Sequence, residues 1–161
     1  MAKRKAHRTE LPHVGWREWI ALPELGISAV KAKVDTGARS SALHAFGVRE
    51  FSRDGISWVR FKVHPLQRNT KVTVAAEAEL LEYRLVRSST GHLQRRPVIC
   101  TQMDLHGNSY TIELTLTNRD AMGFRMLIGR QAVRGRFLVD PGHSYKMGRI
   151  KKKKKKIKKK A

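Results

Sequence analysis

Val34-Asp35-Thr36-Gly37-Ala38-Arg39-Ser40-Ser41 is the stretch of this sequence on which the interpretation of the whole chain depends. It follows Val30-Lys31-Ala32-Lys33, where apolar and basic residues alternate, which is typical of a half-buried strand that ends in a turn. An Asp at this point, followed by a small hydroxyl residue and a Gly, suits a loop that presents a carboxylate, because Gly allows close backbone approach and the Thr hydroxyl can hold the loop. The same residues also suit a plain Asx turn, so the rest of the chain must decide between the two.

The composition indicates one basic globular domain. The chain has 161 residues, of which 40% are hydrophobic, enough for a real core. Its net charge of +21 is uneven: nine charges lie in 151–160 and a net three in residues 1–10, which leaves +9 for residues 11–149. We therefore expect polyanionic partners, among them nucleic acid, the ribosome, anionic lipid or an acidic peptide.

The ends of the chain differ from its centre. The basic N-terminal residues 1–13 and the Lys-rich residues 150–161 predict no packed structure, and residues 14–149 predict the folded domain. The Lys tail either adds salt-sensitive affinity for RNA and acidic chains or is a functionless solubilising extension.

The sequence also predicts a compartment. A single cysteine, Cys100, excludes an intramolecular disulfide, and its neighbours Val98 and Ile99 predict a buried strand position. The basic N-terminus has no apolar region behind it, and no apolar run has the length of a membrane span. We expect a cytoplasmic protein without a membrane partner.

Alternation of apolar and polar residues, the period of a strand, runs through most of the chain. It predicts strands over 14–23, 28–34, 40–45, 46–51, 57–64, 71–74, 82–87, 93–105, 110–117, 124–129 and 137–141. Residues 130–134 fit a short helix, and residues 75–81 have the propensity for one or two helical turns. The predicted class is all-β with one short helix near the C-terminus.

A second element supports the first. Met126-Leu127-Ile128-Gly129-Arg130 lies about ninety residues after Asp35 and precedes the predicted helix and last strand. In this order of elements the chain resembles the retropepsins, the single-domain aspartic proteases of retroviral type. More narrowly, it is similar to the bacterial retropepsin-like family labelled "ATP-dependent zinc protease" (RimB-like). The runs 116–122 and Leu138-Val139-Asp140-Pro141 are the more specific marks of that family.

The resemblance implies a fold and a catalytic group. The fold would be a closed, retropepsin-like β-barrel in which Leu127, Ile128, Gly129 and Arg130 pack behind the active-site loop. Asp35, Thr36 and Gly37 would form the catalytic loop of an aspartic endopeptidase.

One carboxylate is not enough for this chemistry, since two carboxylates facing each other share a proton and act as base and acid. A second copy of Asp35 would therefore come from a homodimer. The remaining aspartates near turns are interpreted as turn or cap residues; they are Asp54, Asp104, Asp120 and Asp140.

The same resemblance places a flap over the substrate at Ser88–His92, with Gly91 at its hinge or tip; an ordinary hairpin turn is the alternative. The residues assigned to substrate binding are Ala38, Arg39, Arg87, Gly91, Arg95 and Arg96. Each Arg alone also fits a solvated strand edge, but together they favour an acidic substrate.

Arg39 departs from the viral pattern. Viral retropepsins carry an Asp there, paired with the Arg of the Gly-Arg element, whereas here Arg39 and Arg130 have like charges. Arg130 must therefore find another partner. The family is associated with an ATP-dependent ligase that adds glutamates to a small-subunit ribosomal protein, which implies a glutamate-rich ribosomal tail, or a glutamylated ribosomal protein, as substrate.

No sequence motif supports a metal or nucleotide. There is no His-Glu-x-x-His, no Cys pair and no Gly-rich phosphate loop, so we expect neither a metal site nor a cofactor. Two other functions remain open. One is a non-catalytic basic adaptor that binds ribosomal RNA or acidic peptides, and the other is a metallopeptidase.

Overall fold

The computed structural model describes residues 10–67, 69–88, 90–118 and 123–148. Its strands are β1 (His13–Gly15), β2 (Arg17–Leu22), β3 (Ile27–Asp35), β4 (Ser41–His44), β5 (Phe46–Arg53), β6 (Ile56–Val63), β7 (Val74–Arg87), β8 (Leu93–Leu105), β9 (Asn108–Thr117), β10 (Met126–Gly129) and β11 (Leu138–Asp140). A 3-10 turn, η1 (Pro23–Leu25), and one α-helix, α1 (Arg130–Val133), complete the described elements.

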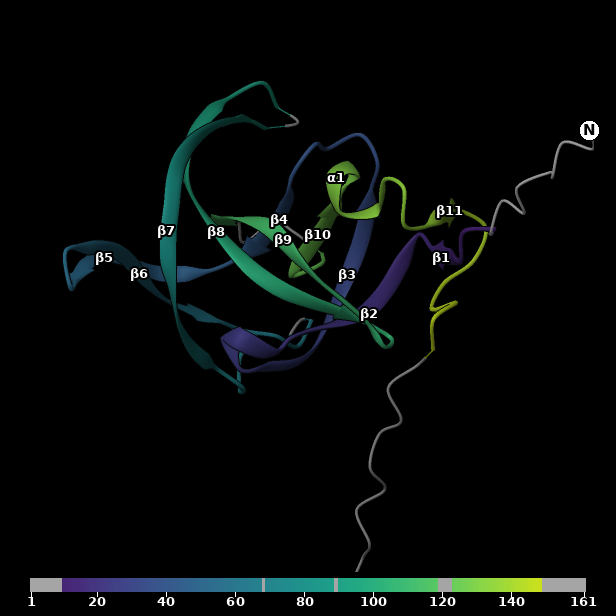
Figure 1. Cartoon of the computed structure of the whole chain (residues 1–161), viewed down its shortest axis with the longest axis horizontal. Coiled ribbons are helices and arrows are strands. Elements are labelled where there is room, and N and C mark those ends of the chain that lie inside the picture. Colours follow the sequence, from purple (N-terminus) through teal and green to yellow (C-terminus); the bar gives the residue numbers. More distant parts are fainter. Residues whose placement is uncertain (1–9, 68, 89, 119–122, 149–161) are drawn as a thin grey trace, which may run out of the picture.

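Nine strands form one strongly curved sheet in the order β2-β3-β10-β4-β9-β8-β7-β6-β5 (Figure 1). A pairing of Ala21 in β2 with Asp104 in β8 returns the sheet onto itself, so that six of the strands make a ring. The β5–β6 hairpin and the end of the β7–β8 hairpin project beyond that ring. The predicted all-β class with one short helix near the C-terminus is confirmed.

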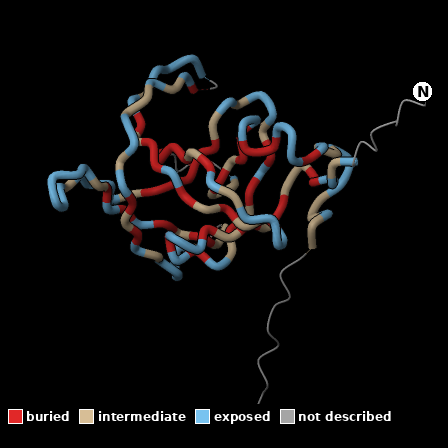
Figure 2. Tube along the Cα trace, in the orientation of Figure 1, coloured by how far each residue is buried: buried red, intermediate tan, exposed pale blue. Residues whose placement is uncertain are grey.

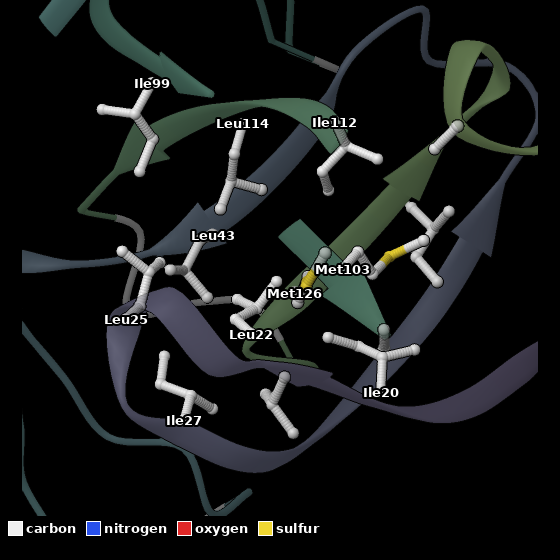
Figure 3. Close-up of a cluster of buried hydrophobic side chains, with 14 of the residues drawn as sticks. Ile20, Leu22, Leu25, Ile27, Leu43, Ile99, Met103, Ile112, Leu114 and Met126 are labelled. Atoms are coloured by element: carbon white, nitrogen blue, oxygen red, sulfur yellow. The ribbon is translucent and has the colours of Figure 1, made fainter. Parts of the chain in front are cut away.

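The inner side of the ring holds the core. Alternate residues of β2 and β3 are buried, and so are the apolar residues of β4, β9 and β10 that face them. Leu43, Met103, Leu114 and Met126 are fully buried and lie close together in Figure 3. Burial of each such side chain contributes about 1.5–3 kcal/mol. Figure 2 shows the contrast with the projecting hairpins, whose residues are mostly exposed.

A segment beyond the last strand belongs to the domain. β1 and β11 pair in parallel, and residues 141–148 then return to β2. The fully buried carboxylate of Glu18 accepts N–H groups from Gly15 (3.0 Å) and Met147 (3.2 Å). His13, which the sequence assigned to an unstructured N-terminus, is part of β1. The other predictions for the two termini fall on residues 1–9 and 149–161, outside the described residues.

The predicted helical turns at residues 75–81 are wrong. These residues are part of β7, which pairs with β6 through its first half and with β8 through its second half. Ala76 and Ala78 are buried in alternation. Pairing with β6 up to Glu79 and with β8 from Leu80 outweighs a weak helical propensity, because propensity differences among ordinary residues are only fractions of a kcal/mol.

The predicted burial of Cys100 is wrong as well, since its side chain is exposed on β8. The β7–β8 register shifts between Leu80 and Glu82. Across that irregularity Val98 and Ile99 are both buried, so the alternation changes phase and Cys100 lies on the outer side. No helix in the described part of the chain is long and apolar enough to cross a membrane.

Candidate active site

The candidate site begins where β3 ends. Asp35 is half-buried at the last position of β3, and its Oδ1 accepts the N–H of Gly37 at 3.0 Å. The backbone N–H of Ala38 donates to the carbonyl of Asp35 at 3.2 Å. In this tight turn the backbone therefore fixes one oxygen of the Asp35 carboxylate.

The element around Gly129 supports this loop from behind. β10 runs parallel to β3 with Gly129 opposite Asp35, and the buried N–H of Gly129 donates to Ser41 Oγ at 3.0 Å. The next two N–H groups, of Arg130 and Gln131, donate to the carbonyls of Ala38 (2.7 Å) and Arg39 (3.1 Å). We call this unit, comprising β10 and α1 with the loop 35–41, the brace.

Glycine is required in the brace because of space. Gly129 has φ −80°, which any residue can adopt, but a Cβ added there would lie 2.4 Å from the carbonyl carbon of Ser40. The two backbones can approach this closely only without a side chain.

Arg130 finds the partner that the sequence left open. Its Nη1 donates to the carbonyl of Thr36 at 2.9 Å, so its guanidinium holds the loop by the backbone and not through a carboxylate. Arg39 is exposed and lines the cleft described below. Arg130 therefore contacts the loop backbone, while Arg39 lines the cleft.

The β7–β8 hairpin extends over the loop that follows β3 (Figure 1). Near its tip Ser88 and His92 are joined by a backbone hydrogen bond of 2.8 Å, and Gly91 has φ +85°, a left-handed conformation that favours glycine. Arg87 Nη1 donates to the carbonyl of Gly91 at 3.1 Å. The predicted flap is Ser88–His92 at the end of this hairpin, and from here on we use the name flap for residues 84–96, which include its two arms.

Between brace and flap lies a cleft of about 460 Å³. Its lining brings together, among the residues predicted for the site, Asp35, Gly37, Ala38, Arg39, Arg87, Arg96 and Leu127. The predicted residues outside the lining are Thr36, Gly91, Arg95, Ile128, Gly129 and Arg130. Arg95 is exposed, and its guanidinium stacks on the ring of Tyr83 at 3.8 Å.

Arg84 also lines the cleft, and the sequence interpretation missed it. Its Nη1 donates to Glu113 at 2.9 Å and to Ser40 Oγ at 3.3 Å, and it also pairs with Glu82. The hydrogen bonds that Arg84 donates to the carboxylates of Glu82 and Glu113 raise the pKa of its guanidinium. The signal that would have found it is the hairpin register, in which Arg84 lies directly opposite Arg96.

The cleft combines one acid with several cations. Asp35 is the single carboxylate among the described residues that line it, against Arg39, Arg84, Arg87 and Arg96. The positive charge of Arg84 is compensated by its two glutamates, so the positive charge that the cleft presents to solvent comes from the exposed Arg39 and Arg87. Such a site can polarise water with its carboxylate and attract anionic groups with its guanidinium groups.

The other carboxylates have local roles. Asp54 is at the β5–β6 tip with φ +51°, Asp104 accepts the N–H of Gly107, and Asp140 accepts that of Gly142. This agrees with their interpretation as turn residues, while Asp120 lies outside the described residues. Within the described ranges no group of three or more His, Cys, Asp or Glu side chains is placed to hold a metal ion.

Comparison with known proteins identifies this architecture. Residues 13–151 match the model of the RimB-like family, described as retropepsin-like aspartic endopeptidase RimB. A crystal structure of a Legionella pneumophila protein of unknown function superposes with a TM-score of 0.71 at 28% identity, covering 84% of this chain and 98% of that one.

Longer relatives carry another name. Proteins from Parasynechococcus marenigrum and Shewanella pealeana, 52% and 46% identical over 135 residues, are each called a probable alpha-L-glutamate ligase. These matches cover 84% of this chain but only 29% and 30% of the relatives, so the chain spans less than a third of their length.

Proposed function

Because the chain belongs to the RimB-like family of retropepsin-like proteins, we propose that it is an aspartic endopeptidase in which Asp35 activates water. The observation that supports this most directly is the position of Asp35. It ends a strand whose alternate residues are buried, lines the cleft, and lies in a loop held by three successive backbone N–H groups of β10 and α1. Positioning of this kind is what a general base requires.

The proposed reaction needs a second carboxylate, and the described lining of the cleft offers only Asp35. We therefore propose a two-fold homodimer in which two copies of Asp35 face each other and share one proton. The ionised carboxylate takes a proton from a water molecule while the oxygen of that water attacks the scissile carbonyl carbon. The protonated carboxyl group donates its proton to the carbonyl oxygen, and the amine then leaves with a proton as the C–N bond breaks.

The charge of the cleft supports an acidic substrate. Arg39, on the loop after β3, and Arg87, on the hairpin, are exposed and line the cleft, and the buried Arg96 also lines it. Guanidinium groups bind carboxylates with paired hydrogen bonds. The relatives called glutamate ligases contain a segment like this chain, which supports a glutamate-rich substrate; we propose an acidic tail of a ribosomal protein, cleaved in the cytoplasm.

The test is Asp35→Asn, with cleavage of a glutamate-rich peptide as readout. We expect loss of cleavage by at least about a hundredfold, since general acid–base groups contribute on that scale, while peptide binding persists. Asp54→Asn is the matched control, because it removes an exposed carboxylate in a turn that Asn also tolerates. Cleavage that survives Asp35→Asn would exclude the aspartic mechanism, and cleavage abolished by a chelator would indicate a metallopeptidase.

Mixing subunits tests the dimer. An equal mixture of wild-type and Asp35→Asn chains, allowed to exchange, should keep about one quarter of the activity of the same total amount of wild-type if both subunits are needed. A self-sufficient subunit would keep about one half. Strictly monomeric mass at the concentration of the assay would also contradict the shared site.

A basic adaptor remains the second candidate function, and one surface favours it. On β2 and β3 the Arg17 guanidinium lies over the rings of Trp16 (4.6 Å) and Tyr145 (5.0 Å), and Lys31 lies over Trp19 (5.4 Å). Aromatic rings interleaved with cations suit single-stranded RNA. If wild-type and Asp35→Asn bind ribosomal RNA equally and neither cleaves any acidic peptide, the adaptor is the better description.

A further inference from the structure

A second hollow adjoins the cleft on the far side of the loop that follows Asp35. Its volume is about 240 Å³, and it is bounded by β9, by the start of β4 and by the helix α1 with the residues after it. Ser40 lines both this hollow and the cleft. None of the other residues so far assigned to catalysis or substrate binding lines it, so it is a separate place beside the proposed reaction centre.

One strand connects the two spaces. Thr111 and Glu113 of β9 line the hollow, and Thr115, next on the same side of the strand, lines the cleft. Residues two apart on a strand are separated by about 7 Å. Consider a peptide that lies extended along β9 with one of its residues in the cleft. A side chain about two to four residues further along that peptide would then reach the hollow.

The hollow offers hydrogen-bond donors that the described part of the chain does not use. No ion pair of Arg136 and no side-chain hydrogen bond of Gln131 is found among the described residues, and both residues are exposed. The Arg136 guanidinium is held at 3.9 Å from the Tyr110 ring centre, and the Tyr110 hydroxyl is anchored to the Ala132 carbonyl at 2.6 Å. A stacked guanidinium loses little freedom when it binds a ligand.

Glu113, which also lines the hollow, does not cancel the preference of these donors for a carboxylate. Glu113 accepts a hydrogen bond from Arg84 at 2.9 Å, and since Arg84 also pairs with Glu82, the charge of Glu113 is partly compensated and one of its oxygens is already bound. The Ser41 hydroxyl is committed to Gly129 N–H. The unused groups are thus a guanidinium and an amide, which are donors suited to a carboxylate.

We propose that this hollow, with Arg136 and Gln131 as its donors, binds an acidic side chain of the substrate a few residues away from the cleaved bond. The inference rests on the proposed peptidase function, because it treats the bound chain as the substrate. It adds a requirement that the cleft alone does not make: the substrate carries a carboxylate at a distance from the reaction centre as well as beside it.

The experiment compares Arg136→Gln with Arg134→Gln. Arg134 is also exposed and immediately follows α1 but does not line the hollow, so both changes remove one charge from the same region. The probes are tetraglutamate and tetraglutamine, with affinities and the backbone amide shifts of Ser40 and Gln131 measured on each full-length protein. We expect Arg136→Gln to weaken tetraglutamate binding about tenfold, the scale of one charged hydrogen bond, and Arg134→Gln to change it less than twofold.

Further measurements separate the site from bulk charge and from the reaction. Arg136→Lys should restore only part of the affinity, since an ammonium group lacks the planar fork. Equal losses in Arg136→Gln and Arg134→Gln, or equal shifts with tetraglutamine, would overturn the proposal. Binding that depends on Arg136 in a protein that cleaves nothing would support the hollow and reject the peptidase. If cleavage requires Asp35 but is equal in Arg136→Gln and Arg134→Gln, the peptidase function is supported and the proposed site in the hollow is rejected.

Discussion

The two sides of the cleft are built in opposite ways. On the brace side Gly129 is buried, Ser41 and Ile128 are buried with it, and successive N–H groups fasten the loop of Asp35. On the flap side Leu85 and Leu93 are largely exposed, and a few hydrogen bonds at the tip hold the turn. One side is part of the core, whereas the other extends from it (Figure 2).

This difference indicates a division of labour. The proposed pairing of two Asp35 carboxylates needs a loop with one conformation, which dense packing and satisfied backbone groups provide. A segment that admits and covers a peptide belongs at the low-stability end of the molecule, where few buried contacts resist opening. The brace should therefore determine stability and kcat together, and the flap should affect mainly the binding of substrate.

The largest expected effect is the difference in stability between a glycine substitution in the brace and one in the flap. Gly129→Ala places a Cβ 2.4 Å from backbone of Ser40, whereas a Cβ at Gly91 meets nothing within 4 Å and is only strained by φ +85°. We expect Gly129→Ala to lower the free energy of unfolding by about 3 kcal/mol or more, since overpacking against backbone is not easily relieved. Gly91→Ala should cost about 1 kcal/mol, the left-handed strain alone.

Urea unfolding of both variants measures these values, and cleavage kinetics add the functional side. Gly129→Ala should lose kcat, and Gly91→Ala should change KM more than kcat. Similar destabilisation of the two variants would mean that brace and flap do not differ as proposed.

A smaller effect is expected from Ser41→Ala within the brace. The hydroxyl of Ser41 accepts the buried N–H of Gly129, and its removal leaves that donor without its partner. Such a loss costs about 1–3 kcal/mol. Ser52→Ala on the exposed β5–β6 hairpin is the control and should lie within about 0.5 kcal/mol of wild-type by chemical unfolding. Equal effects of the two serines would show that the hydroxyl is not needed to hold Gly129.

The brace is also the part that the sequence predicts best. The strand before Asp35, the turn after it, the apolar run ending in Gly129 and the short helix from Arg130 are all local patterns, and each is found where it was expected. Their contact with one another is not local, and it was expected from resemblance to a family and not from spacing. The parallel pairing of β10 with β3 supplies that contact.

The long β7–β8 hairpin shows why other parts could not be predicted. β7 has two neighbours, and the change of neighbour near Leu80 bends the strand and shifts the alternation of β8. No single segment contains that information, so residues 75–81 looked helical and Cys100 looked buried. The same register decides that Arg84 lines the cleft and that Arg95 stacks on Tyr83 instead.

The smallest effect distinguishes two tyrosines, of which one packs beside the brace and the other lies next to the flap. Burial raises the pKa of Tyr110, beside α1, to about 12, although the nearby Arg136 lowers it. On β7, just before the flap, the hydrogen bond to Glu50 is the main cause that raises the pKa of Tyr83. The first shift therefore depends on packing of the brace and the second on one exposed contact.

The sign of the effect of Tyr110 on stability follows from the direction of its shift. Its folded pKa lies above the ordinary value of 10.0, so the folded state keeps its proton where the unfolded state has lost it. The associated stabilisation is complete below pH 10 and is lost as the pH rises through about 12.

Absorbance at about 295 nm, where ionised tyrosine absorbs, should show a step near pH 12 that Tyr110→Phe removes, given the ordinary value near 10 for exposed tyrosine. Arg136→Gln should move that step upward, because the cation that lowers the pKa of Tyr110 is gone. A step that stays in place in Arg136→Gln would mean that the guanidinium is not held over the ring, and the carboxylate site proposed beside it would lose its preorganised donor.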